Sequence, residues 1–173
     1  LENNCCPVHK TKIEKLKEES YFFRLSKYQE KLLELYEKNK EFILPKNRKE
    51  EITNRIKEGL KDLSISRTSF NWGIPLPFDK KHVCYVWFDA LFNYYTATRT
   101  KDREKFWPAD VQIIGKDISW FHYVYWPAFL MSAKIKLPEK IFSHGWWTFD
   151  KEKISKSRGK VININELISI AGV

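Results

Sequence analysis

Residues 110–144 read DVQIIGKDISWFHYVYWPAFLMSAKIKLPEKIFSH, and this stretch decides the fold. Its two ends, residues 110–114 and 140–144, are short apolar runs bounded by polar residues, which is typical of buried strands. The long, mostly apolar segment between them, residues 117–133, predicts a helix. A strand, a helix and a strand in this order predict a parallel βαβ unit.

The same alternation begins further upstream. Residues 82–86 predict another buried strand, and residues 88–97 predict the helix that follows it. The region from 82 to 144 is therefore predicted to be α/β, with three parallel strands. Ligands of such sheets bind outside the carboxyl ends of the strands, so the residues that follow each strand are the candidates for a site.

Residues 13–60 have a different character, charged and helical. Apolar residues recur there at three- and four-residue steps between lysines and glutamates, and Pro45 is expected to end the first helix. Asn47 is expected to cap a second helix over residues 48–60. Neither helix suggests chemistry.

The composition is that of a globular chain. Of its 173 residues 43% are hydrophobic, yet no uninterrupted apolar run is long enough to span a bilayer, so we expect no membrane association. The net charge of +9 either favours a polyanionic partner or reflects a lysine-rich solvated surface. Three cysteines without the paired spacing of a structural zinc site lead us to expect reduced thiols and no zinc. Reduced thiols indicate the cytoplasm or the matrix of an organelle.

The first predicted strand is followed by a candidate apolar slot. Trp87, Ala90, Leu91 and Tyr94 stand at the i, i+3, i+4 and i+7 positions of the helix, so they share one face. Large aromatic rings on either side of a small residue favour a slot for an apolar ligand. An ordinary core stripe would have the same pattern.

The second strand ends in Gly115, which allows a ligand to approach the backbone closely. Asp117 begins the next helix, either as a cap or as a partner for an ammonium group or a ribose hydroxyl. On that helix Ile118, His122 and Trp126 follow at four-residue steps and are predicted to share a face. A histidine in this place is either a ligand contact or a satisfied core residue.

The third strand is followed by His144-Gly145-Trp146-Trp147 and then by Lys153-Ile154-Ser155-Lys156-Ser157-Arg158-Gly159-Lys160. Four cations and two hydroxyl groups in eight residues suit the oxygens of a polyphosphate. A solvated basic loop, or a lysine cluster of the nuclear-localisation type, is the alternative.

Together these segments resemble the class I aminoacyl-tRNA synthetases, and within them the methionyl enzymes. Lys153-Ile154-Ser155-Lys156-Ser157 resembles the Lys-Met-Ser-Lys-Ser loop, with His144-Gly145-Trp146-Trp147 upstream of it as in that family. Residues 85–94 resemble its Tyr-Val-Trp-Leu-Asp-Ala-Leu-x-Asn-Tyr segment, and residues 114–133 are similar to its Gly-Lys-Asp-Ile-x-x-Phe-His-x-x-x-Trp-Pro-Ala segment. Four motifs in the order of the family are far more specific than any one of them.

The resemblance implies a role for each motif residue. A pocket for the methionine side chain is implied for Trp87, Ala90, Leu91, Tyr94, Ile118, His122 and Trp126. Asp117 is implied near the methionine ammonium group or the ATP ribose, with Gly115 against the nucleotide and His144 and Gly145 near the adenine. The signature loop implies catalytic roles for Lys153, Lys156 and Ser157, with Lys156 on the phosphates.

The resemblance also implies a division of the chain. Residues 1–67 would end the inserted connective region, residues 68–150 would form the second half of a Rossmann-like catalytic domain, and residues 151–173 would hold the signature loop and the start of a helical region. The His-Ile-Gly-His signature of the first half-sheet does not occur in the sequence. We therefore expect a fragment that lacks the N-terminal half of the catalytic core and is inactive alone.

The activity that the resemblance implies is activation of L-methionine with ATP and Mg²⁺, followed by its ligation to tRNA-Met. Gln112 departs from the family, which usually has His at this position. Two alternatives remain open from the sequence. One is another class I synthetase for an apolar amino acid, and the other is a noncatalytic RNA-binding module descended from a synthetase.

Overall fold

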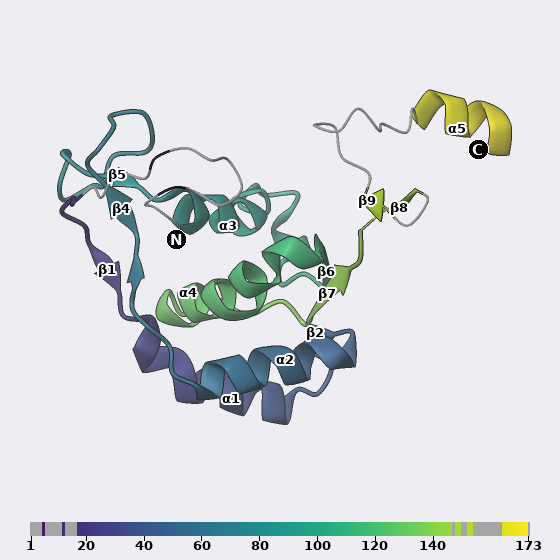
Figure 1. Cartoon of the computed structure of the whole chain (residues 1–173), viewed down its shortest axis with the longest axis horizontal. Helices are drawn as coiled ribbons and strands as arrows, with labels where there is room; N and C mark the ends of the chain where they lie inside the picture. Colours follow the sequence, from purple (N-terminus) through teal and green to yellow (C-terminus); the bar gives the residue numbers. More distant parts are fainter. Residues whose placement is uncertain are drawn as a thin grey trace.

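The computed structural model describes Cys5, Lys12 and residues 17–146, 148–149, 152–153 and 164–172. Its α/β part contains a three-stranded parallel sheet (Figure 1). β6 (Val111–Gly115) pairs with β7 (Lys140–His144) along its whole length, and the short β2 (Ile43–Leu44) pairs with the other edge of β7. The predicted α/β class and the two strands of the predicted βαβ unit are confirmed.

The segment between β6 and β7 is helical as predicted, but its geometry changes along the way. A 3₁₀ turn (Lys116–Ile118) follows β6, a π-helical turn (Phe121–Tyr125) comes next, and α4 (Trp126–Ser132) completes the segment. The first five residues of α4 are all buried. They form the core between α3 (Val86–Thr96) on one side and α1 (Gln29–Lys38) and α2 (Lys46–Lys57) on the other (Figure 1).

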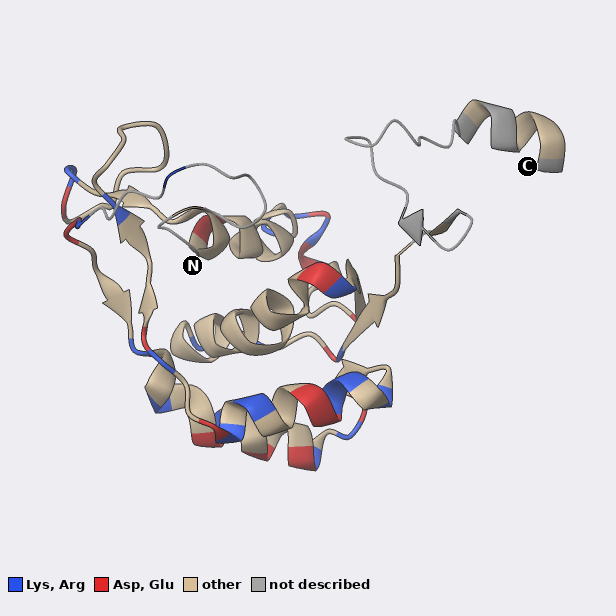
Figure 2. Ribbon diagram, viewed as in Figure 1, with Lys and Arg blue, Asp and Glu red and all other residues tan. Residues whose placement is uncertain are grey.

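Charge follows this layering. Figure 2 shows acidic and basic residues gathered along α1 and α2, whereas α4 has none. A helix whose polar face meets water carries charges there, while a helix packed on all sides is apolar all round. α4 is therefore the buried central element, and α1 and α2 form an outer layer.

The prediction that residues 82–86 form a strand of the parallel sheet was wrong. The strand there is β5 (Val83–Cys84), and it pairs antiparallel with β4 (Ser66–Arg67) outside the three-stranded sheet. The loop between them folds back, since the Cys84 amide donates to the Ile74 carbonyl oxygen at 2.7 Å. An apolar run of this length does not reveal its partner, because local and distant pairing demand the same residue types.

The predicted helix boundaries near Pro45 were also wrong. α1 ends at Lys38, and α2 begins at Lys46 with Pro45 as its N-cap residue, so Asn47 lies inside the helix. The apolar segment before Pro45 joins the sheet as β2. A residue that precedes proline is driven out of the helical region, which favours this strand over a longer helix. α2 ends at Lys57, before Gly59, whose φ of +109° suits a glycine.

The remaining elements are short. β1 (Phe22–Phe23) pairs antiparallel with β3 (Leu63–Ser64), and 3₁₀ turns span Leu25–Tyr28 and Glu104–Phe106. β8 (Thr148–Phe149) pairs antiparallel with β9 (Glu152–Lys153), and α5 (Ile164–Ala171) follows. Within the described ranges, none of the helices combines the length and the apolar character needed to cross a membrane.

One face of the parallel sheet is uncovered among the described residues. Along β6, Gln112 and Ile114 are buried, whereas Val111 is 47% exposed and Ile113 is 71% exposed. Phe142 of β7 adds a third exposed apolar side chain. Parallel sheets are ordinarily covered on both faces, so an open apolar face of this kind is unusual.

Candidate functional site

An aromatic cluster forms where α3 meets the helical segment that follows β6. Trp87 and Tyr94 come from α3, and His122 and Trp126 come from the other segment. The ring centroids of Trp87 and His122 lie 6.4 Å apart, and those of Tyr94 and Trp126 lie 6.1 Å apart. The two helical faces that the sequence singled out therefore meet.

A hydrogen-bond chain fixes the protonation of this cluster. The Ile118 carbonyl lies 3.0 Å from His122 Nδ1, and a carbonyl oxygen only accepts, so Nδ1 carries the proton. Nε2 is then an acceptor, and the Tyr94 hydroxyl donates to it at 2.9 Å. His122 is thus held as the neutral Nδ1–H tautomer.

Burial reinforces this neutral state. Desolvation lowers the pKa of His122 below its ordinary value, and the hydrogen bond to Ile118 opposes that change only in part. Desolvation also raises the pKa of Tyr94, which keeps its hydroxyl protonated as a donor. The cluster is therefore uncharged, and the hydrogen-bonded Tyr94–His122 pair gives it a polar part.

The other predicted pocket residues differ in burial. Leu91 is 1% exposed and belongs to the hydrophobic core, whereas Ala90 and Ile118 are half-buried. Phe121, which sequence reasoning missed, stacks on Trp87 with ring centroids 3.9 Å apart and so covers one face of that indole. The signal was available, because Phe121 stands three positions after Ile118 and so neighbours it on a helix face, but the four-residue steps to His122 and Trp126 passed over it.

The predicted nucleotide-site residues gather at the carboxyl ends of β6 and β7. Gly115 and His144 stand opposite each other in the last rung of the sheet. A Cβ atom added at Gly115 or at Gly145 would meet no atom within 4 Å, so the backbone is open to a ligand at both glycines. This edge is where parallel α/β sheets bind ligands.

Trp146 links the two strand ends, and sequence analysis quoted it within a motif without assigning it a role. Its Nε1–H donates to Asp117 Oδ2 at 2.6 Å, and the Lys116 ammonium lies 3.6 Å from the centre of its ring. The bond holds the carboxylate that was predicted to meet an ammonium group or a ribose. The signal that was available is the position of Trp146 directly after His144-Gly145.

Only the start of the signature loop lies within the described residues. Lys153 ends β9, in the hairpin with β8. Lys156 and Ser157 lie outside the described residues. Their catalytic roles, like those of the other site residues, stay predictions.

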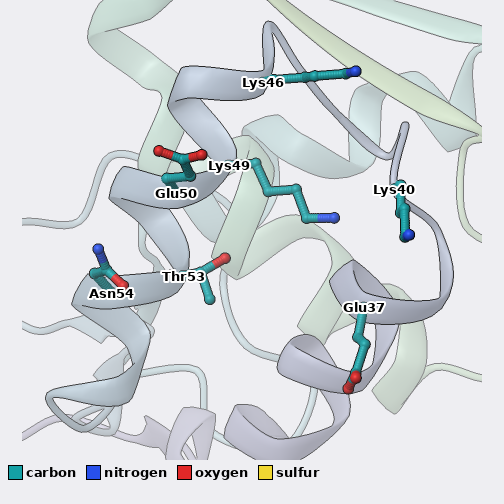
Figure 3. Close-up of a pocket in the computed structure, with 7 residues that line it drawn as sticks. All are labelled: Glu37, Lys40, Lys46, Lys49, Glu50, Thr53 and Asn54. Carbon is teal, nitrogen blue, oxygen red and sulfur yellow. The ribbon is translucent and has the colours of Figure 1, made fainter.

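A pocket of about 600 Å³ lies elsewhere, between α1 and α2 (Figure 3). Figure 3 shows Lys49 and Thr53 pointing into it from α2, with Lys40 across the space and Glu50 turned away. None of the predicted site residues is among those that line it, which are Glu37, Lys40, Lys46, Lys49, Glu50, Thr53 and Asn54. Lysines and glutamates in nearly equal number make this an ordinary solvated surface, and we assign it no ligand.

The described part of the chain offers no resident metal centre, because no three His, Cys, Asp or Glu side chains in it are arranged to hold an ion. Cys5 and Cys84 are free thiols.

The fold and the site define part of a parallel α/β domain with an aromatic cluster beside the carboxyl ends of its strands. The family model for tRNA synthetases class I (M) matches residues 1–173, the whole chain. The chain therefore belongs to the methionyl-tRNA synthetase family, which confirms the resemblance seen in the sequence.

Relatives at high identity agree. The chain is 57% identical over 165 residues to the methionine--tRNA ligase of Rickettsia bellii and 58% identical over 167 residues to that of Brucella suis, which covers 93% and 94% of the chain. Each alignment takes in only 32% of the relative, so the chain spans about a third of their length.

Solved structures match as well. A Mycobacterium tuberculosis methionyl-tRNA synthetase bound by methionyl-adenylate superposes with a TM-score of 0.85 at 46% sequence identity. The match covers 96% of this chain and 34% of that one. The apo form of that enzyme matches with a TM-score of 0.77 over 84% of this chain.

Proposed function

We propose that the full-length protein activates L-methionine with ATP and then ligates it to tRNA-Met. The observation that carries this proposal is the neutral Tyr94–His122 pair inside an aromatic cluster, in a chain 46% identical to an enzyme crystallised with methionyl-adenylate. A thioether has no charge to recognise, so a dry aromatic slot with a neutral polar part suits it. The alternatives, a synthetase for another apolar amino acid or a noncatalytic RNA-binding module, have no observation of this kind in their favour.

The chemistry needs positioning more than covalent catalysis. An oxygen of the methionine carboxylate bonds to the α-phosphorus of ATP, and the bond from that phosphorus to pyrophosphate breaks. The methionyl group then passes to the 2′-hydroxyl of the terminal adenosine of the tRNA, and AMP leaves. The protein contributes by holding the two reactants in line and by balancing the charge on the phosphates.

Each part of the site has a proposed task in that reaction. Trp87, Tyr94, His122 and Trp126 enclose the side chain, together with the buried Leu91 and the half-buried Ala90 and Ile118. Asp117, whose carboxylate Trp146 holds by a hydrogen bond, pairs with the methionine ammonium group or the ribose. Gly115, His144 and Gly145 lie along the nucleotide, and the loop with Lys153, Lys156 and Ser157 neutralises the phosphates. Mg²⁺ enters with ATP as its counter-ion, and no residue is assigned to it.

We also propose that the 173 residues are inactive alone. Among the described residues β6 is an edge strand of the sheet, and Ile113 and Phe142 are exposed on its face. Both features suit further strands and helices supplied by a longer protein. The division into a connective part (residues 1–67), half of the catalytic domain (residues 68–150) and the signature region (residues 151–173) is part of this proposal.

The test is methionine-dependent exchange of pyrophosphate into ATP by the full-length protein, with leucine, isoleucine and valine as competing substrates. We expect exchange with methionine alone, and we expect Lys156→Ala to abolish it. A full-length protein that binds RNA without any exchange would overturn the proposal in favour of the noncatalytic module. Exchange that survives Lys156→Ala would remove that lysine from the mechanism.

A further inference from the structure

Gln112 occupies an unusual place for an amide. It lies in the middle of β6 on the covered face of the sheet, next to Ile114, and is only 5% exposed. A polar side chain buried among apolar neighbours is unfavourable unless it forms hydrogen bonds. Its contacts therefore indicate what it is there to do.

The amide accepts a hydrogen bond from the cluster described above. Trp126 Nε1–H donates to Gln112 Oε1 at 3.1 Å, and both side chains are buried. Because an indole N–H only donates, Oε1 must face Trp126, which fixes the orientation of the amide. The Nε2 group then faces away and has no hydrogen-bond partner within the described part of the chain.

This bond decides which way the indole lies. Trp126 is packed by the rings of Phe92, Tyr94 and Trp107, with centroid distances of 5.3, 6.1 and 6.0 Å. Packing restricts the asymmetric indole, and the hydrogen bond adds a direction to that restriction, because a rotated ring would leave its buried Nε1–H without an acceptor. Gln112 Oε1 is the acceptor that holds it.

We propose that Gln112 is a positioning residue for amino-acid selection, and that its Oε1 holds Trp126 in the orientation that sets the depth of the methionine pocket. This inference rests on the proposed function. The depth of an apolar pocket is what distinguishes side chains that differ by one methylene, a difference worth roughly 10- to 200-fold in specificity. Gln112 would thus act on recognition without touching the substrate.

The experiment uses the full-length enzyme and the pyrophosphate-exchange assay with methionine, ethionine and norleucine. Gln112→Leu removes the acceptor and is expected to raise KM for methionine roughly tenfold and to weaken the discrimination against ethionine, with KM for ATP unchanged. Gln112→His offers a ring nitrogen as acceptor and is expected to restore both KM for methionine and the discrimination against ethionine. Gln112→Asn keeps the amide but shortens the side chain, so it should change KM for methionine and the discrimination against ethionine in the same direction as Gln112→Leu.

A purely structural role would give a different result. Ile114→Val loses one methylene from the same face of the same strand, so it should lower Tm and leave KM for methionine unaltered. If Gln112→Leu and Gln112→Asn behave like Ile114→Val, the inference fails while the proposed function stands. If the wild-type enzyme shows no methionine-dependent exchange, the proposed function fails instead.

Discussion

The hydroxyl group of Tyr94 donates to Nε2 of His122 at 2.9 Å and so joins α3 to the π-helical turn after β6. Because Nδ1 of the same ring bonds to the Ile118 carbonyl, both nitrogens are used, and the ring has one tautomer and one orientation. The consequences of this pair are directly measurable.

Tyr94→Phe should weaken methionine binding. The variant leaves the buried Nε2 of His122 without its donor, which costs about 1–3 kcal/mol, and we expect KM for methionine in pyrophosphate exchange to rise roughly tenfold. Tyr95→Phe is the matched control, since Tyr95 lies on the same helix but packs against Trp107. An equal rise of KM in both variants would show that the Tyr94–His122 bond is not the cause.

Acidification should destabilise the protein partly through His122. The pKa of this ring is lowered from 6.5 by burial, so the unfolded state takes up a proton at a higher pH than the folded state. The stability that His122 contributes is complete above pH 6.5, the pKa in the unfolded state. It is lost as the pH falls from there to the lower pKa of the folded state, at no more than about 1.4 kcal/mol per pH unit. Denaturant unfolding at pH 7.5 and 5.5 should show that His122→Gln loses less unfolding free energy on acidification than wild type. Identical losses would contradict the assignment of His122 as a neutral ring.

Asp117→Asn should lower kcat/KM for methionine by roughly 100-fold, because it removes the charge-assisted contact proposed for the methionine ammonium group and keeps the size of the side chain. Trp146→Phe removes only the donor to Asp117 Oδ2, so its effect should be smaller and of the same kind. Steady-state exchange kinetics measure both. A Trp146→Phe variant more impaired than Asp117→Asn would mean that the indole itself, and not the carboxylate it holds, contacts the substrate.

Two neighbouring residues of β6 test whether the open face of the sheet is covered in the full-length protein. Ile113 is 71% exposed, so Ile113→Asp should change the stability of the 173-residue chain by less than about 0.5 kcal/mol. In the full-length protein the same change should sharply reduce the soluble yield. Ile114→Asp, at a position 3% exposed, should be damaging in both contexts. If full-length Ile113→Asp is obtained at the wild-type soluble yield, the face of the sheet is open in the full-length protein as well.

The sequence predicted the parts of the fold whose signal is local. The strand at residues 140–144 and the helix that leads to it were placed correctly, because an apolar strand and a long apolar helix differ in length and periodicity. The pairing of Val83–Cys84 with Ser66–Arg67 was missed, since a strand's residues do not encode its partner. The strand Ile43–Leu44 was missed because two residues are too few for a period.

The candidate site shows the same division. Trp87, Tyr94, His122 and Trp126 were found from helical spacing, and the structure brings them together. Phe121 was missed because only four-residue steps from Ile118 were followed, although a residue three positions after Ile118 also lies on that face. Gln112 gave a signal that was available, a single amide in an apolar strand, but its partner Trp126 lies fourteen positions away and only the fold brings them into contact.

The wide turn at Phe121–Tyr125 makes the site sensitive to residue count. A turn of this type holds one residue more than an α-helical turn, so deleting a single residue from it would restore ordinary helix and absorb the change locally. Trp126 and the rest of α4 would then keep their place in the core, while side chains within the turn, such as Phe121 and His122, would point in new directions. A change of length here would therefore alter the aromatic cluster without displacing the buried helix that follows it.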